Sequence, residues 1–186
     1  MQQSQFDEKN ERVVFQSNPP WVQVKQTVKG FFFLERKGKD SVAVFLIRKN
    51  PDTITGYEVL IRLQPLPLDN SDNQKLYACP VTGSLDEGEN IRQCALREVQ
   101  EETGYKLDSV KNLGAYIVGS QVNEFCYMFY SDVTGMIPGD APQDGGYDES
   151  ISKNVWVPME NLNHYDYSAC QIGYLRLIQI LENQEA

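Results

Sequence analysis

Short runs of aliphatic and aromatic residues recur along the chain and are separated by polar, turn-forming segments. Runs of this length and composition are typical of β-strands. We predict strands within residues 21–34, 42–48, 57–63, 76–79, 113–119, 125–130 and 154–157. The pattern therefore indicates a protein that is rich in β-sheet.

Helical periodicity is confined to two segments. Residues 89–103 carry the first and are followed by Gly104, a residue suited to the left-handed position that ends a helix. Residues 168–181 carry the second, with apolar side chains spaced three or more residues apart. We therefore expect an α+β fold, in which a mixed sheet is flanked by helices.

The distribution of polar residues indicates one domain. Residues 1–12 are mostly polar or charged and are interpreted as a flexible N-terminal tail. Residues 13–182 contain neither a repeat nor a linker, and their length suits a single hydrophobic core. Two segments rich in Pro, Gly, Asn and Asp, residues 65–74 and 134–150, are predicted to be loops.

The net charge narrows the range of functions. The chain has 17 Lys and Arg against 26 Asp and Glu, a net charge of -9. This sign disfavours affinity for a nucleic-acid backbone. A phosphorylated substrate would also be repelled by the protein as a whole. The site for such a substrate would need its own positive charge, most simply a divalent metal ion.

Histidine and cysteine usage disfavours several kinds of chemistry. One histidine, His164, does not suffice for a His-ligated zinc site, and four widely spaced cysteines form no metal-binding pair. The N-terminal segment has no apolar leader, so free thiols in the cytoplasm are expected. The longest apolar run, residues 42–47, is far below the roughly 20 residues of a membrane helix. No membrane association is expected.

Carboxylates on the first predicted helix carry the strongest chemical signal. At about 100° per residue, Ala95 and Val99 share an apolar arc that also contains Glu102, while Glu98 lies at its edge. Like charges at this spacing repel, and a half-buried carboxylate carries a desolvation cost. Arg97 can reach Glu101, but it leaves Glu98 and Glu102 without a partner. Oxygen ligands of this kind suit Mg²⁺ or Mn²⁺.

The segment GSLDEGENIRQCALREVQEETGY, residues 83–105, matches every fixed position of the pattern G-x5-E-x7-R-E-U-x-E-E-x-G-U, where U is aliphatic or aromatic. In this it resembles the Nudix box, the signature of the Nudix hydrolases. A match over 23 residues is far more specific than a lone glycine motif. The resemblance implies the α/β/α sandwich of that family.

The resemblance also implies roles for residues of the box. Glu98, Glu101 and Glu102 would hold Mg²⁺ or Mn²⁺, with the Gly83 carbonyl as a further ligand. Arg97 would orient the glutamates, Glu89 would brace the loop before the helix, and Gly104 would end the helix. The implied reaction is the attack of water on one phosphorus of a pyrophosphate group, in which Glu98 and Glu101 take part. Homodimers are common in this family.

Features around the box favour a nucleoside triphosphate as substrate. The run Val81-Thr82-Gly83-Ser84 resembles that of the nucleoside triphosphate and dihydroneopterin triphosphate pyrophosphohydrolases. Residues 119–121, Gly-Ser-Gln, lack the proline that is typical of ADP-ribose hydrolases. ADP-ribose or a nucleoside diphosphate sugar is the alternative substrate. A ligand-sensing module without catalysis is an alternative of another class, which the intact box disfavours.

Two candidate residues lie outside the box. Glu149 ends the predicted loop 134–150 and is a candidate general base or metal ligand, with Asp144 and Asp148 as alternatives. A polar loop residue without a catalytic role would fit the same position equally well. Trp21 is a weaker candidate for stacking on the base of a substrate.

Overall fold

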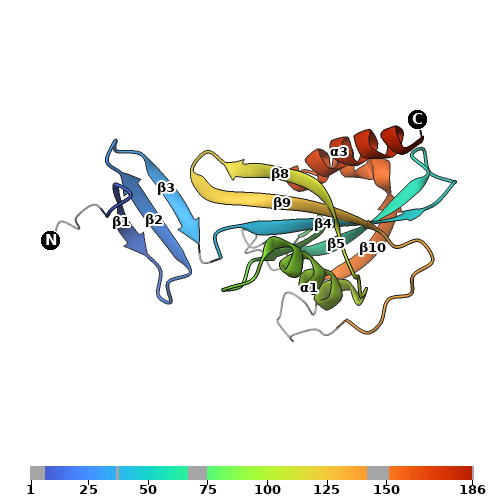
Figure 1. Cartoon of the computed structure of the whole chain (residues 1–186), viewed down its shortest axis with the longest axis horizontal. Helices are drawn as coiled ribbons and strands as arrows, with labels where there is room; N and C mark the ends of the chain where they lie inside the picture. Colours follow the sequence, from blue (N-terminus) through green and yellow to red (C-terminus); the bar gives the residue numbers. More distant parts are fainter. Residues whose placement is uncertain (1–6, 37, 67–74, 142–150, 186) are drawn as a thin grey trace.

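The computed structural model describes residues 7–36, 38–66, 75–141 and 151–185. Within these ranges ten strands form one sheet, and a long helix covers each of its faces (Figure 1). The strands are β1 (Glu11–Gln16), β2 (Val22–Thr27), β3 (Phe32–Arg36), β4 (Ser41–Lys49), β5 (Tyr57–Pro65), β6 (Leu76–Cys79), β7 (Val81–Ser84), β8 (Lys111–Gly119), β9 (Val122–Asp132) and β10 (Lys153–Pro158). The helices are α1 (Ile91–Thr103), the 3-10 helix η1 (Met159–His164) and α3 (Ser168–Glu185).

The sheet is mixed. Its strand order is β1-β2-β3-β9-β4-β5-β10, with β6 added to β5, β7 to β4 and β8 to β9. β9 runs parallel to both β3 and β4, while the other pairs are antiparallel. This arrangement, with α1 and α3 on opposite faces, confirms the predicted α+β class.

Strand β4 contributes to two hydrophobic cores. Because side chains alternate along a strand, its residues Ala43, Phe45 and Ile47 pack on the α3 side, where Leu177 is also buried. The intervening Val42, Val44 and Leu46 pack on the α1 side. Each of these β4 side chains is at most 1% exposed. Burial on both faces explains the uninterrupted apolar run in the sequence.

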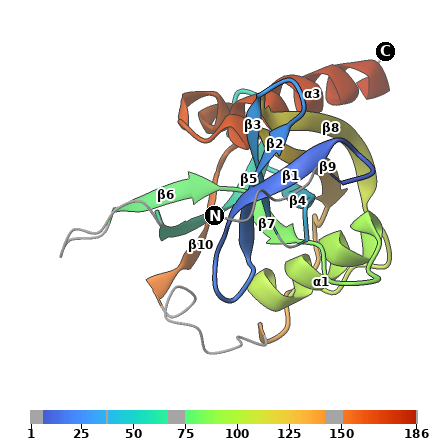
Figure 2. The ribbon, with the colours of Figure 1, turned by 90° about the vertical axis from the view of Figure 1, so that its left-hand side faces the viewer.

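Near the N-terminus the structure differs from the prediction. Residues 21–34 were expected to form one strand, but β2 and β3 are separated by a turn at Gly30, whose φ is +88°. β1 begins at Glu11, inside the predicted tail, and residues 1–6 lie outside the described residues. β1 escaped prediction because none of its residues is buried, so no clear alternation of apolar and polar positions marks it. The strands β1–β3 project from the rest of the molecule in Figure 1 and lie in front of it in Figure 2.

The box spans the end of the sheet and the first helix. The register of β4 with β7 pairs Val42 with Gly83, so the first glycine of the box lies within the sheet. Asn90 caps α1 by accepting hydrogen bonds from the amides of Arg92 and Gln93. Gly104 ends the helix in the left-handed conformation, with φ at +74°. In the part of the chain that the structure describes, no helix is long and apolar enough to cross a membrane.

Candidate active site

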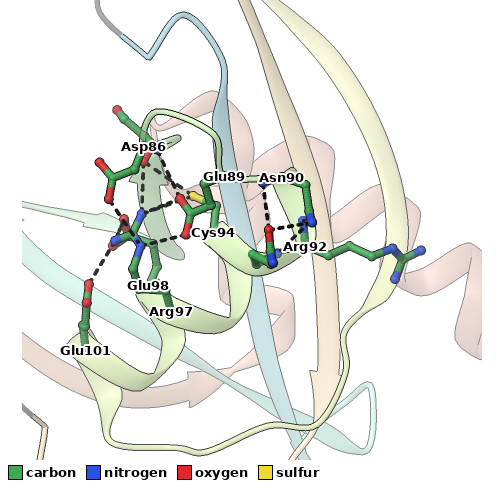
Figure 3. A network of polar contacts seen from close by, with 10 residues as sticks. Asp86, Glu89, Asn90, Arg92, Cys94, Arg97, Glu98 and Glu101 are labelled. Carbon is green, nitrogen blue, oxygen red and sulfur yellow. Dashed lines mark hydrogen bonds and ion pairs between the residues drawn. The ribbon is translucent and has the colours of Figure 1, made fainter.

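Arg97, near the middle of α1, is the centre of a network of ion pairs (Figure 3). Its Nε and Nη2 each donate to one oxygen of Glu89 at 3.0 Å. Its Nη1 donates to Glu98 at 2.7 Å and to Glu101 at 3.0 Å. Nη2 also donates to the carbonyl of Ser84 at 3.2 Å. One guanidinium therefore holds three carboxylates of the box and the end of β7 together.

Glu89 joins the loop before α1 to the helix itself. Besides its two bonds from Arg97, it accepts a hydrogen bond from the amide of Asp86 at 3.2 Å. The bonds from Arg97 lower the pKa of Glu89, and in turn these bonds raise the pKa of Arg97. Glu89 is therefore ionised at neutral pH and contacts both the loop and the helix.

Glu98 is the most perturbed carboxylate of the network. Its side chain is only 13% exposed, and burial raises its pKa to about 7, even though Arg97 favours the ionised form. Its carboxyl group lies directly against the α-carbon of Gly83, so that any side chain at position 83 would overlap it. A glycine is required here because of this close approach rather than because of backbone conformation.

Glu102 lies outside the Arg97 network and has a different partner. Nε of Arg62, on β5, lies 3.2 Å from Glu102 Oε1, and both side chains are largely buried. Arg62 Nη1 and the side-chain amide of Asn154 also donate to the backbone carbonyl of Glu102, at 3.3 Å and 2.7 Å. The expectation that side chains leave Glu98 and Glu102 uncompensated was therefore wrong. Arg97 contacts the former and Arg62 the latter.

The pairing of Arg62 with Glu102 was not predicted because the two residues are distant in the sequence. The surroundings of Arg62 in the sequence nevertheless indicate that it needs a partner. It is a charged residue flanked by Leu60, Ile61 and Leu63 within a predicted strand. A charge in a buried strand requires a partner of opposite sign. The carboxylates of the box were among the candidates.

The carboxylates of the network partly fit a divalent metal ion. Among the described residues, no group of three or more His, Cys, Asp or Glu side chains is arranged to hold one. Oxygens of Glu98 and Glu101 nevertheless converge on one atom, Nη1 of Arg97. Carboxylate oxygens are the ligands that Mg²⁺ and Mn²⁺ prefer. The donor chemistry therefore fits such an ion at Glu98 and Glu101, whereas Glu102 is paired with Arg62 through Oε1.

The candidates outside the box differ in how far the structure describes them. Trp21 is 57% exposed and lines a hollow of about 670 Å³ together with Ser84, Leu85, Asp86 and Glu87. It therefore lies beside the loop of the box, although it precedes that loop by more than sixty residues. Glu149, Asp148 and Asp144 lie outside the described residues. The four cysteines are buried and free, as expected.

The sequence of the chain matches the model of the NUDIX domain over residues 25–177. The protein therefore belongs to the Nudix family, which confirms the resemblance drawn from the box. A Caenorhabditis elegans protein named as nudix hydrolase 1 is 42% identical over 53 residues. That match spans 28% of this chain and 14% of the relative.

Three solved structures share the fold at 16% sequence identity. An ADP compounds hydrolase superposes with a TM-score of 0.62, covering 94% of this chain and 93% of its own. A mutT/nudix family protein from Listeria innocua gives 0.56, covering 79% and 96%. An Ap4A hydrolase from Caenorhabditis elegans gives 0.54, covering 77% and 98%. At this level of identity the similarity establishes the fold.

Proposed function

We propose that the protein is a metal-dependent pyrophosphohydrolase that cleaves a nucleoside triphosphate or a related nucleotide by attack of water at phosphorus. The observation that carries this proposal is the convergence of Glu89, Glu98 and Glu101 on Arg97, with Glu98 packed against Gly83. An arrangement that served only stability would not need a buried carboxylate whose pKa is raised.

In this proposal Glu98, Glu101 and Glu102, with the Gly83 carbonyl, hold Mg²⁺ or Mn²⁺. When bound, the ion neutralises the phosphate oxygens and lowers the pKa of the attacking water. Arg97 and Glu89 keep the carboxylates in place before the substrate arrives. Glu149 is the proposed acceptor of the proton that water loses, and the phosphorus–oxygen bond to the leaving phosphate then breaks. Most of the rate enhancement comes from positioning and electrostatics.

The alternative substrates are ADP-ribose and nucleoside diphosphate sugars. One structural neighbour, which covers 94% of this chain, is an ADP compounds hydrolase, and its name is in line with this alternative. The Val81-Thr82-Gly83-Ser84 run and the absence of proline from residues 119–121 favour the triphosphate. A non-catalytic sensing module is the alternative of another class, and the intact box speaks against it.

One experiment separates these possibilities. Nucleoside triphosphates, ADP-ribose and nucleotide sugars are incubated with the protein and Mg²⁺ or Mn²⁺, and the products are identified. We expect a nucleoside monophosphate and pyrophosphate from a triphosphate, and no turnover in EDTA until metal is restored. A kcat/KM at least tenfold higher for ADP-ribose or a nucleotide sugar, about 1.4 kcal/mol in transition-state binding, would establish the alternative substrate. Full turnover in EDTA would refute the metal-dependent mechanism.

Trp21 is proposed to contact the base of the nucleotide. Its exposure and its place in a hollow shared with the loop of the box support this role. Aromatic rings stack on bases with little dependence on sequence or base identity. The Trp21→Ala variant should therefore raise KM more than it lowers kcat.

A homodimer is proposed as the oligomeric state, with β1–β3 in the interface. None of residues 7–36 is buried, which is unusual for a sheet, since small sheets need a packed face for stability. Besides Trp21, six large apolar residues in this region are at least 38% exposed: Val13, Val14, Phe15, Val28, Phe31 and Phe32. A second copy presents the same surface and would bury it symmetrically.

The molar mass from light scattering tests this proposal. We expect a dimer for the wild type and a monomer for Phe15→Ser combined with Phe31→Ser. Ile54→Ser is the control, because Ile54 is 91% exposed on the loop between β4 and β5. A monomeric wild type at micromolar concentration would exclude the dimer.

A cytoplasmic location is also proposed, since all four cysteines are free.

A further inference from the structure

A cleft of about 200 Å³ adjoins the first strand of the box. Its lining comes from β3, β4, β6, β7 and β9 and from the turn before α3, and includes Arg36, Ser41, Tyr77, Gly83, Glu124 and Tyr167. Gly83 forms one wall, and on its other side lies the carboxyl group of Glu98. The cleft therefore adjoins Gly83, the residue whose carbonyl is a proposed metal ligand.

Arg36 and Glu124 form a fixed pair in this cleft. Nε and Nη2 of Arg36 each donate to one oxygen of Glu124 at 2.8 Å, which is a bidentate arrangement. The hydroxyl of Ser41 also donates to Glu124, at 2.6 Å. Glu124 is only 8% exposed, whereas the side chain of Arg36 is 35% exposed. The carboxylate is thus a buried support, and the guanidinium is the group that a ligand can reach.

The pairing with Glu124 leaves part of the guanidinium available. A guanidinium has five N–H donors, and the bidentate bond uses two of them. Nη1 of Arg36 makes no hydrogen bond to any other described residue. Because Glu124 fixes the plane of the group, the remaining donors are oriented before a ligand binds. A phosphate group accepts such paired donors with little loss of entropy.

Arg36 also connects the cleft to Trp21. A second hollow, of about 180 Å³, is lined by Arg36 and by Pro20, Trp21, Gln23 and Glu35. The hollow of about 670 Å³ described above is lined by Trp21 and the loop of the box. It includes Ser84, which also lines the cleft. Arg36 therefore lies between the proposed reacting centre at Gly83 and the proposed base contact at Trp21. In a nucleotide this intermediate position corresponds to the phosphate next to the nucleoside.

We propose that Arg36 binds the phosphate group adjacent to the nucleoside, and that Glu124, supported by Ser41, is the residue that positions Arg36. This assignment rests on the proposed nucleotide substrate. A protein with a net charge of -9 repels a phosphorylated substrate unless the site supplies positive charge. Arg36 supplies such a charge independently of any metal ion.

Binding without turnover tests the assignment. ADP, GDP, CDP and UDP are titrated into the protein in EDTA by calorimetry, and each is compared with its nucleoside. For Arg36→Gln we expect Kd for the diphosphates to rise at least about tenfold and Kd for the nucleosides to stay unchanged. The Arg36→Lys variant should recover only part of the affinity, because lysine lacks the planar fork. Arg48→Gln, which removes an arginine paired with Glu58, is the matched control and should leave both constants unchanged.

A double variant separates binding from folding. Arg36→Gln alone leaves Glu124 buried with Ser41, which is costly, so Arg36→Gln with Glu124→Gln is measured in parallel. We expect the double variant to fold and still to lose diphosphate affinity. Glu124→Gln alone should weaken diphosphate binding less than Arg36→Gln does. Adding Ser41→Ala to Glu124→Gln should weaken this binding further.

The outcomes distinguish this assignment from the proposed function. If no diphosphate binds the wild type at millimolar concentration, or if the double variant binds as tightly as the wild type, the assignment is wrong whatever the enzyme hydrolyses. If diphosphate binding depends on Arg36 but no nucleotide is hydrolysed with Mg²⁺ or Mn²⁺, the phosphate site stands and the proposed activity fails.

Discussion

Arg62 and Glu102 form a buried ion pair, with Nε of the arginine 3.2 Å from Oε1 of the glutamate, that joins strand β5 to the helix of the box. The carboxylates of the box are therefore not equivalent. Glu89, Glu98 and Glu101 share Arg97, whereas Glu102 has an arginine of its own. The arginines that contact these carboxylates lie on two different elements.

This pair predicts that two neighbouring substitutions differ in their effect on stability. Considered only as one of several like charges, Glu102→Gln would be expected to raise the melting temperature. Because Arg62 is 6% exposed, the same change instead leaves a buried guanidinium without its counter-charge. We expect Glu102→Gln to lower the free energy of unfolding in EDTA by about 1–3 kcal/mol.

The matched control is Glu101→Gln, whose side chain is 43% exposed and which should change stability by less than about 0.5 kcal/mol. Urea unfolding of both variants provides the measurement. An increase in stability for Glu102→Gln would show that repulsion among the carboxylates outweighs the pair with Arg62. Both variants should lower kcat in the presence of Mg²⁺.

Gly83 is predicted to tolerate no side chain. A methyl group at this position would overlap the carboxyl group of Glu98 and force it to move. Gly83→Ala should therefore lower kcat at saturating metal and cost about 1–3 kcal/mol of stability.

Gly119→Ala is the matched control for this change, because its methyl group would lie 3.7 Å from Val122 Cγ2, an ordinary contact. It should be close to wild type in both measurements. Equal effects of the two substitutions would mean that the approach of Glu98 to Gly83 has no functional importance.

The pKa of Glu98 predicts how stability depends on pH in EDTA. Burial raises this pKa from 4.5 to about 7, so between these values the folded protein binds the proton more tightly than the unfolded chain does. Stability should therefore fall as the pH rises through this window, by an amount of the order of 1–3 kcal/mol.

The Glu98→Gln variant isolates this contribution, because it removes the titrating group and keeps the shape. Urea unfolding at pH 5, 6, 7 and 8 should give a smaller decrease for this variant than for the wild type. Parallel pH profiles would show that Glu98 does not titrate in this range. Glu89 does not confound the comparison, since its pKa is lowered and it is ionised throughout.

The sequence was informative where the determinants are local. The box, the two helices and the strands that pack against them, apart from the short β7, could be predicted, because periodicity and motif spacing lie within short segments. Arg62 and the Arg36–Glu124 pair could not be located, since their partners are 40 and 88 residues away in the chain. Glu124 looks like an ordinary polar residue in the sequence, and the parallel pairing of β9 with β4 and with β3 brings it to Ser41 and Arg36. β1 was missed because it contributes little to the core.

Glu149 lies outside the described residues, and its role stays a prediction from the sequence. It ends a long segment, residues 134–150, rich in Gly and Pro, and such loops frequently carry ligands or cover a site. The strand β10 begins at Lys153, shortly after it.

If Glu149 accepts a proton or binds metal in the transition state, Glu149→Gln should lower kcat while changing stability by less than about 0.5 kcal/mol. Steady-state kinetics at saturating metal provide the measurement, and Asp144→Asn and Asp148→Asn serve as neighbouring controls. A loss confined to one of these neighbours would move the role to that residue, whereas wild-type kcat in all three variants would place the catalytic carboxylates entirely within the box.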